Sequence, residues 1–158
     1  MSDAARMLLA TAHLPGIDTA VLAECIDAAD TCAQSCTACA DACLHEYDLR
    51  RECVHACATC ADVCETTARV LSRASTWDLH VVAKLLETCV RACSSAAAHC
   101  EGHADTAKYC AICAEACRRC EKACQQVLIA LATLVASVPT STDGAAGAGE
   151  ADVLGSGA

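Results

Sequence analysis

Aromatic residues are nearly missing from this chain. Its 158 residues include one Trp, two Tyr and no Phe, whereas aromatic side chains usually contribute much of the buried area of a protein core. Hydrophobic residues still make up 55% of the chain, and most of them are Ala and Cys, which are small and permit close approach of helices. We therefore expect a core filled by small side chains, neutral cysteine among them.

Helix-breaking residues are almost as scarce. Proline occurs only at Pro15 and Pro139, and Gly102 is the sole glycine between Gly16 and Gly144. Because proline and glycine are the residues that most disfavour helices, this segment should be helical almost throughout. The sequence predicts a short amphipathic helix at about 3–12, followed by four long helices at about 18–45, 49–73, 76–101 and 105–137.

Polar residues indicate where these helices end. Asp18, Ser75 and Asp105 are predicted to cap N-termini, because their side chains can accept hydrogen bonds from free backbone N–H groups. Gly102 is a natural C-terminal cap. A polar stretch without an apolar stripe predicts a turn near Asp48.

The chain also lacks a basic excess and a membrane span. Its formal net charge of −9 argues against nucleic acid and anionic membrane surfaces as partners, since both call for basic patches. No apolar stretch approaches the length of a membrane span, and the run Met7–Ala10 is too short for the apolar part of a signal peptide. We therefore expect a cytoplasmic protein with reduced thiols, in which many cysteines indicate metal binding before disulfides.

In contrast to the residues that it lacks, the chain has many cysteines. There are seventeen, in four runs, and every step within a run is three, four or seven residues. Such steps return to the same face of a helix. The runs are Cys25, Cys32, Cys36, Cys39 and Cys43; Cys53, Cys57, Cys60 and Cys64; Cys89, Cys93 and Cys100; and Cys110, Cys113, Cys117, Cys120 and Cys124.

Four long helices with short connections predict an all-α fold, an antiparallel up-down-up-down four-helix bundle. The cysteine face of each helix would then turn toward the shared core. The predicted division of the chain is a short N-terminal helix within 1–16, the cysteine-lined bundle over 17–137 and a disordered tail over 138–158.

Antiparallel order predicts two unlike ends for this bundle. One, the histidine end, gathers Cys43, Cys53, Cys100 and Cys110, with His45, His99 and His103 nearby. The other, the plugged end, gathers apolar residues that continue the cysteine faces: Leu22, Leu71, Leu79, Val82, Leu86, Leu131 and Leu134. A ligand of the core should therefore enter at the histidine end.

The cysteine spacing suits a soft metal ion. Sulfurs on residues four apart can close to twice a metal–sulfur bond of about 2.3 Å, as a near-linear site requires. The pairs of this kind are Cys32/Cys36, Cys39/Cys43, Cys53/Cys57, Cys60/Cys64, Cys89/Cys93, Cys113/Cys117 and Cys120/Cys124. Soft thiolates at low coordination number favour Cu(I), with a capacity on the order of one ion per cysteine, whereas zinc needs four ligands assembled across helices.

Other interpretations of the cysteines fit less well. A disulfide scaffold does not explain an odd number of cysteines along the helices of a cytoplasmic chain. Iron–sulfur motifs usually lie on loops, and a redox dithiol needs one exchange site rather than four runs. Zn(II) or Cd(II) sequestration and a redox-sensing thiol protein stay open as alternatives to copper. No nucleophile, base and oxyanion donor converge outside the thiols, so we do not expect an enzyme.

One histidine pair is a further candidate for metal binding. His99 and His103 are four residues apart, and His103 lies one step beyond Cys100 on its face, so the pair could pass Cu(I) to the thiols or hold a terminal ion. The remaining histidines are predicted to take no part: His13, His45, His55 and His80.

The cysteine pattern resembles that of the bacterial copper storage proteins. The resemblance is carried by the CxxxC and CxxC steps of residues 32–43 and 110–124, and it covers about residues 18–137. It implies a cytosolic homotetramer of four-helix bundles whose interior thiolates store many Cu(I) ions. It also implies that His99 and His103 match a histidine pair at the open end of the family's bundle. This chain differs at Ala96, which occupies a position that could hold a thiol.

Overall fold

The computed structural model describes residues 2–11, 16–48 and 50–137, and all the regular structure of these residues is helical. The helices are α1 (Asp3–Thr11), α2 (Thr19–Leu44), α3 (Arg51–Leu71), the 3₁₀ turn η1 (Ala74–Thr76), α4 (Leu79–Glu101) and α5 (Lys108–Ser137). The predicted all-α fold is confirmed. The predicted tail lies outside the described residues, and the predicted division into an N-terminal helix, bundle and tail stays a prediction.

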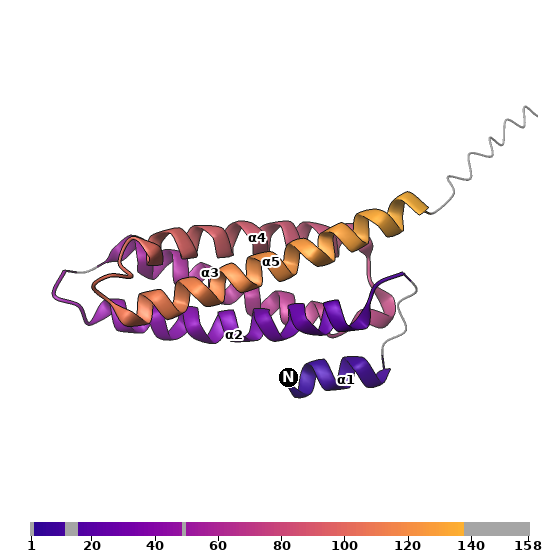
Figure 1. Ribbon diagram of the computed structural model, residues 1–158, viewed down its shortest axis with the longest axis horizontal. Coiled ribbons are helices and arrows are strands. Elements are labelled where there is room, and N and C mark those ends of the chain that lie inside the picture. Colours follow the sequence, from indigo (N-terminus) through magenta and orange to yellow (C-terminus); the bar gives the residue numbers. More distant parts are fainter. Residues whose placement is uncertain (1, 12–15, 49, 138–158) are drawn as a thin grey trace, which may run out of the picture.

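The four long helices form an antiparallel bundle (Figure 1). Helix α2 packs on α3 and α5, and α4 packs on the same two helices, so α2 faces α4 and α3 faces α5 across the diagonals. The α2–α3 and α4–α5 connections lie together at the histidine end, while the α3–α4 connection and the last turns of α5 lie at the plugged end (Figure 1). The antiparallel order therefore gives the bundle two different ends, as predicted.

Two of the three predicted N-terminal caps are wrong. Asp18 caps α2, where its carboxylate accepts a hydrogen bond from the backbone N–H of Ala20. Ser75 instead lies inside η1, and Asp78 caps α4 by accepting bonds from two backbone N–H groups, at 3.0 and 3.2 Å. The reason is tertiary, because the indole of Trp77 donates to the backbone carbonyl of Val70 and holds the connection against α3.

The start of α5 also differs from the prediction. Asp105 lies in the turn that follows α4, and α5 begins at Lys108. The chain makes an extra turn here, in which the N–H of Ala107 donates to the carbonyl of His103 at 2.9 Å. Gly102 caps the C-terminus of α4 as predicted. The chain also turns between His45 and Asp48, as expected.

Helix α1 lies along the outside of α2 (Figure 1). Ser2 donates hydrogen bonds to the Asp27 carboxylate from its backbone N–H, at 2.9 Å, and from its hydroxyl. Ala5 and Leu8 are the buried residues of α1. Gly16 precedes α2 with a φ of +92°, a left-handed conformation that glycine adopts without strain.

The plugged end is filled by larger apolar residues. Leu22, Leu71, Val82, Leu86 and Leu131 are at most 2% exposed, whereas Leu79 and Leu134 are half-buried. Ile26 and Val127, which the sequence analysis did not include, are fully buried and belong to the same core. Between this plug and the histidine end, the buried hydrophobic residues of the four bundle helices are cysteine and alanine. Among the described helices, none is long and apolar enough to cross a membrane.

Candidate metal centre

All seventeen cysteines are buried inside the bundle. Each is at most 1% exposed, and each is a free thiol. Their burial follows from the helical spacing, because steps of three and four keep one face of each helix turned toward the axis. Neutral thiols pack there as small hydrophobic groups.

The sulfur atoms form one continuous network along the bundle. Sixteen of the seventeen, all but Cys43, make a thiol–thiol hydrogen bond of 4.0 Å or less. The network begins near the plug with Cys25 and Cys124, whose sulfurs are 3.6 Å apart. It ends at the histidine end with Cys39 and Cys110, 3.9 Å apart. An ion that enters the core therefore meets an unbroken series of sulfur donors.

The closest sulfur pairs join different helices. Cys36 and Cys117 approach to 3.4 Å, and two further cross-helix pairs lie 3.5 Å apart, Cys57/Cys100 and Cys64/Cys93. Four of the predicted same-helix pairs are also in contact, at 3.8 to 4.0 Å: Cys32/Cys36, Cys53/Cys57, Cys60/Cys64 and Cys120/Cys124. The cross-helix pairs were missed by the sequence analysis, because their approach depends on how closely the helices pack.

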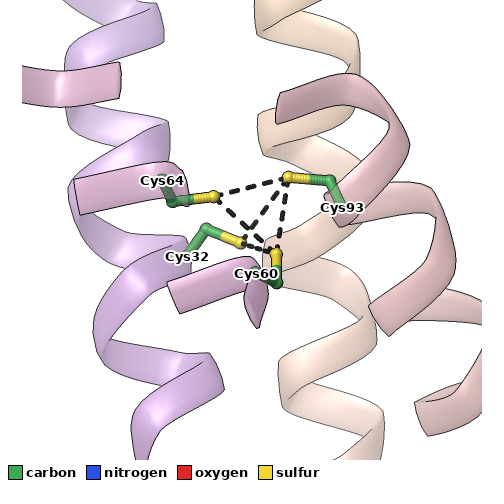
Figure 2. A group of neighbouring side chains, drawn as sticks. All are labelled: Cys32, Cys60, Cys64 and Cys93. Atoms are coloured by element: carbon green, nitrogen blue, oxygen red, sulfur yellow. Dashed lines mark hydrogen bonds between the residues drawn. The ribbon is translucent and has the colours of Figure 1, made fainter. Parts of the chain in front are cut away.

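Thiols gather in five groups of four, each drawn from three or four helices. Within a group the sulfurs all lie within 4.8 Å of one another. Figure 2 shows one group, in which Cys32 of α2, Cys60 and Cys64 of α3 and Cys93 of α4 point toward a common centre. The others are Cys32/Cys36/Cys60/Cys117, Cys39/Cys53/Cys100/Cys110, Cys39/Cys57/Cys100/Cys113 and Cys64/Cys89/Cys93/Cys120.

This arrangement needs little change to bind a soft metal. Two sulfurs on opposite sides of one ion, each bonded at about 2.3 Å, lie about 4.6 Å apart. The neighbouring sulfurs are 3.4 to 4.0 Å apart, so most pairs have to part by about 1 Å or less for a linear site. Because groups share members such as Cys32 and Cys39, one thiolate can bridge two ions.

Burial favours the protonated form of three thiols at the histidine end. Burial raises the pKa of Cys110 to about 12, and burial likewise raises the pKa of Cys43 and of Cys53. Since thiolate is the form that binds metal, an incoming ion must displace protons from these residues.

The histidines lie at the surface of the described structure. His99 and His103 are half-buried, and none of the five thiol groups includes either of them, so their role as ligands stays a prediction. His45, His55 and His80 are exposed, which agrees with their predicted exclusion from the core. His13 lies outside the described residues.

The chain is similar to proteins that store copper. The family described as copper storage protein matches residues 18–129. A search of curated proteins finds no match. Among solved structures, the copper storage protein Ccsp from Streptomyces lividans, loaded with 10 copper equivalents, is 42% identical with a TM-score of 0.77, covering 80% of this chain and 98% of its own.

Two related structures are similarly close. A Streptomyces lividans Ccsp mutant with two histidines replaced by alanine is 44% identical with a TM-score of 0.71, covering 73% of this chain and 98% of its own. A cytosolic copper storage protein from Streptomyces lividans with five coppers is 44% identical with a TM-score of 0.68, covering 70% and 93%. Since the family match over residues 18–129 includes every cysteine, all of α2, α3 and α4 and most of α5, this chain belongs to the copper storage protein family.

Proposed function

We propose that this chain stores Cu(I) in the cytosol, bound by thiolates in the core of its bundle, and that it catalyses no reaction. The observation that carries this proposal is the continuous network of buried sulfurs, with neighbours 3.4 to 4.0 Å apart. Soft thiolates at low coordination number favour Cu(I). The Streptomyces lividans relative is loaded with 10 copper equivalents, and the family is one of storage proteins.

All seventeen cysteines are the proposed ligands, with His99 and His103 at the entry. A mutant of the Streptomyces lividans protein replaces two histidines four positions apart, which is the spacing of His99 and His103 in this chain. We also propose that the protein is a homotetramer, on the resemblance of its cysteine pattern to the family. Sedimentation velocity of the apo and the copper-loaded protein would measure this oligomeric state.

Zinc is the alternative cargo that the geometry also admits. A closed tetrahedral site needs four thiolates of its own, and at most three of the five thiol groups share no sulfur. Zinc sites built from these groups would therefore saturate near three ions, whereas bridging thiolates allow on the order of one Cu(I) per cysteine.

Titration of the reduced protein separates these cargoes. We expect Cu(I), added in competition with a chelator, to reach on the order of one tightly bound equivalent per cysteine, since thiolates can be shared. Zn(II) in a parallel titration should stop near three. Copper saturation at one or two equivalents would overturn the storage proposal, and defined disulfides formed on brief peroxide treatment would favour a redox sensor instead.

A second experiment tests the histidine pair. Replacing both His99 and His103 with alanine should slow copper loading several-fold in stopped-flow measurements while changing the final capacity by about one ion. His55→Ala is the matched control, because His55 is exposed on α3. Equal loading rates in the double variant and the control would exclude the pair from entry.

A further inference from the structure

Arg50 joins opposite corners of the histidine end. It lies just before α3, and its guanidinium extends to residues at and before the start of α5, the helix diagonal to α3. One nitrogen, Nη1, donates to the hydroxyl of Tyr109 at 3.2 Å and to the sulfur of Cys110 at 3.9 Å. The other, Nη2, donates to the Thr106 hydroxyl at 3.5 Å.

Glu46 completes this polar arrangement from the end of α2. The Tyr109 hydroxyl donates to the Glu46 carboxylate at 2.7 Å, so Glu46, Tyr109 and Arg50 form a chain of hydrogen bonds that we call the strap. The strap lies beside Cys110, and the cysteines of this end are at most 1% exposed. Within the described ranges no other cationic side chain donates to a sulfur.

A cation at this position matters because copper binding creates negative charge. When one Cu(I) binds two neutral thiols, two Cu–S bonds form and two S–H bonds break. Both protons pass to solvent or to the ligands of the copper donor, and no electron is transferred. The product, a bis-thiolate Cu(I) unit, carries one negative charge in a setting that water does not reach, where unpaired charge is costly.

We propose that Arg50 is a positioning residue for copper, whose positive charge stabilises a Cu(I)–thiolate unit formed by Cys110 and its neighbour Cys39, whose sulfurs lie 3.9 Å apart. The inference rests on the proposed copper storage function. A guanidinium keeps its charge at any pH of interest and is held in place by two hydroxyl partners. Charge-assisted hydrogen bonds are roughly twice as strong as neutral ones, so its removal should weaken the ions bound at this end.

Competition with a Cu(I) chelator tests the proposal on the full-length protein. In Arg50→Gln we expect the ions held at the histidine end to bind about tenfold more weakly, with the remaining ions unchanged. Arg50→Lys, which keeps the charge, should recover most of the loss. In a Cys110→Ser background, the Arg50→Gln change should have little further effect, because the thiolate it stabilises is gone.

Arg118→Gln is the matched control. Arg118 also joins two helices, through Glu101 at 2.8 Å, but it lies on the outside of the bundle and contacts no thiol. Thermal unfolding of each apo variant separates loss of folding from loss of binding. Unchanged copper affinity in a folded Arg50→Gln variant, or an equal loss in Arg50→Lys, would overturn the role of charge. Failure of wild type and control to bind copper would refute the storage function itself.

Discussion

At the scale of single residues, cysteine serves this core in two ways. As a neutral thiol it packs like a small apolar group, and all seventeen side chains are buried in contact with other core residues. As a thiolate it binds metal. The core can therefore be complete without copper and still accept it, since the same atoms serve both states.

Ala96 offers a test of this dual use. It is fully buried on α4 between Cys93 and Cys100, where the cysteine face of the helix has a gap. Ala96→Cys should raise copper capacity by about one ion and lower apo stability by about 1 kcal/mol, because an added atom crowds a packed core. Metal analysis and urea unfolding measure the two effects. Ala98→Cys is the control, since residue 98 is exposed and should leave tight binding unchanged.

Gly16 supports a second prediction at this scale. Its φ of +92° suits glycine, and a Cβ there would lie 2.7 Å from a methyl carbon of Leu134. Gly16→Ala should therefore destabilise the bundle by about 1–2 kcal/mol, through backbone strain and displacement of Leu134. Gly102→Ala should cost less, since Gly102 has a helical φ of −62°. Equal midpoints of chemical denaturation for the two variants would contradict this account.

At the scale of helices, most of the structure could be predicted from local sequence. The four long helices lie between Gly16 and Pro139, a segment in which Gly102 is the only glycine and proline is absent. Their presence could be predicted because helix propensity is a sum of local terms. The start of α4 could not be predicted in this way. Ser75 and Asp78 are both good capping residues, and the hydrogen bond from Trp77 to Val70 decides between them.

This choice of cap predicts unequal effects of two substitutions. Asp78→Ala removes the carboxylate oxygen that accepts hydrogen bonds from two backbone N–H groups and should lower the free energy of unfolding by about 1 kcal/mol. Ser75→Ala should change it by less than about 0.5 kcal/mol, because Ser75 is exposed and caps no helix. Paired urea titrations of the apo proteins measure both, and a larger loss in Ser75→Ala would mean that α4 begins earlier.

At the scale of the whole molecule, the buried thiols link stability to pH. Burial raises the pKa of Cys110 from its ordinary 9.0 to about 12, and it also raises the pKa of Cys43 and Cys53. The folded state therefore holds these protons more tightly than the unfolded state. Their contribution to stability is complete below about pH 9 and is lost as the pH rises toward 12.

The reduced apo protein should thus unfold more easily at pH 10 than at pH 7. The expected loss is on the order of 1 kcal/mol per pH unit for each such thiol, measured by urea unfolding under a reductant. Stability that does not change over this range would contradict the neutral state of the thiols. Copper binding should show the complementary dependence and weaken as the pH falls, because protons compete for the same sulfurs.

The sequence by itself determined the helices, their cysteine faces and the preference for a soft metal. These follow from spacings of three, four and seven residues, which are local properties of a helix. Only the tertiary structure decided which sulfurs meet, such as Cys36 and Cys117 across 81 positions of the chain, and it alone placed Arg50 against Cys110. Such contacts depend on the axial register and separation of packed helices, and side chains from several helices set these together.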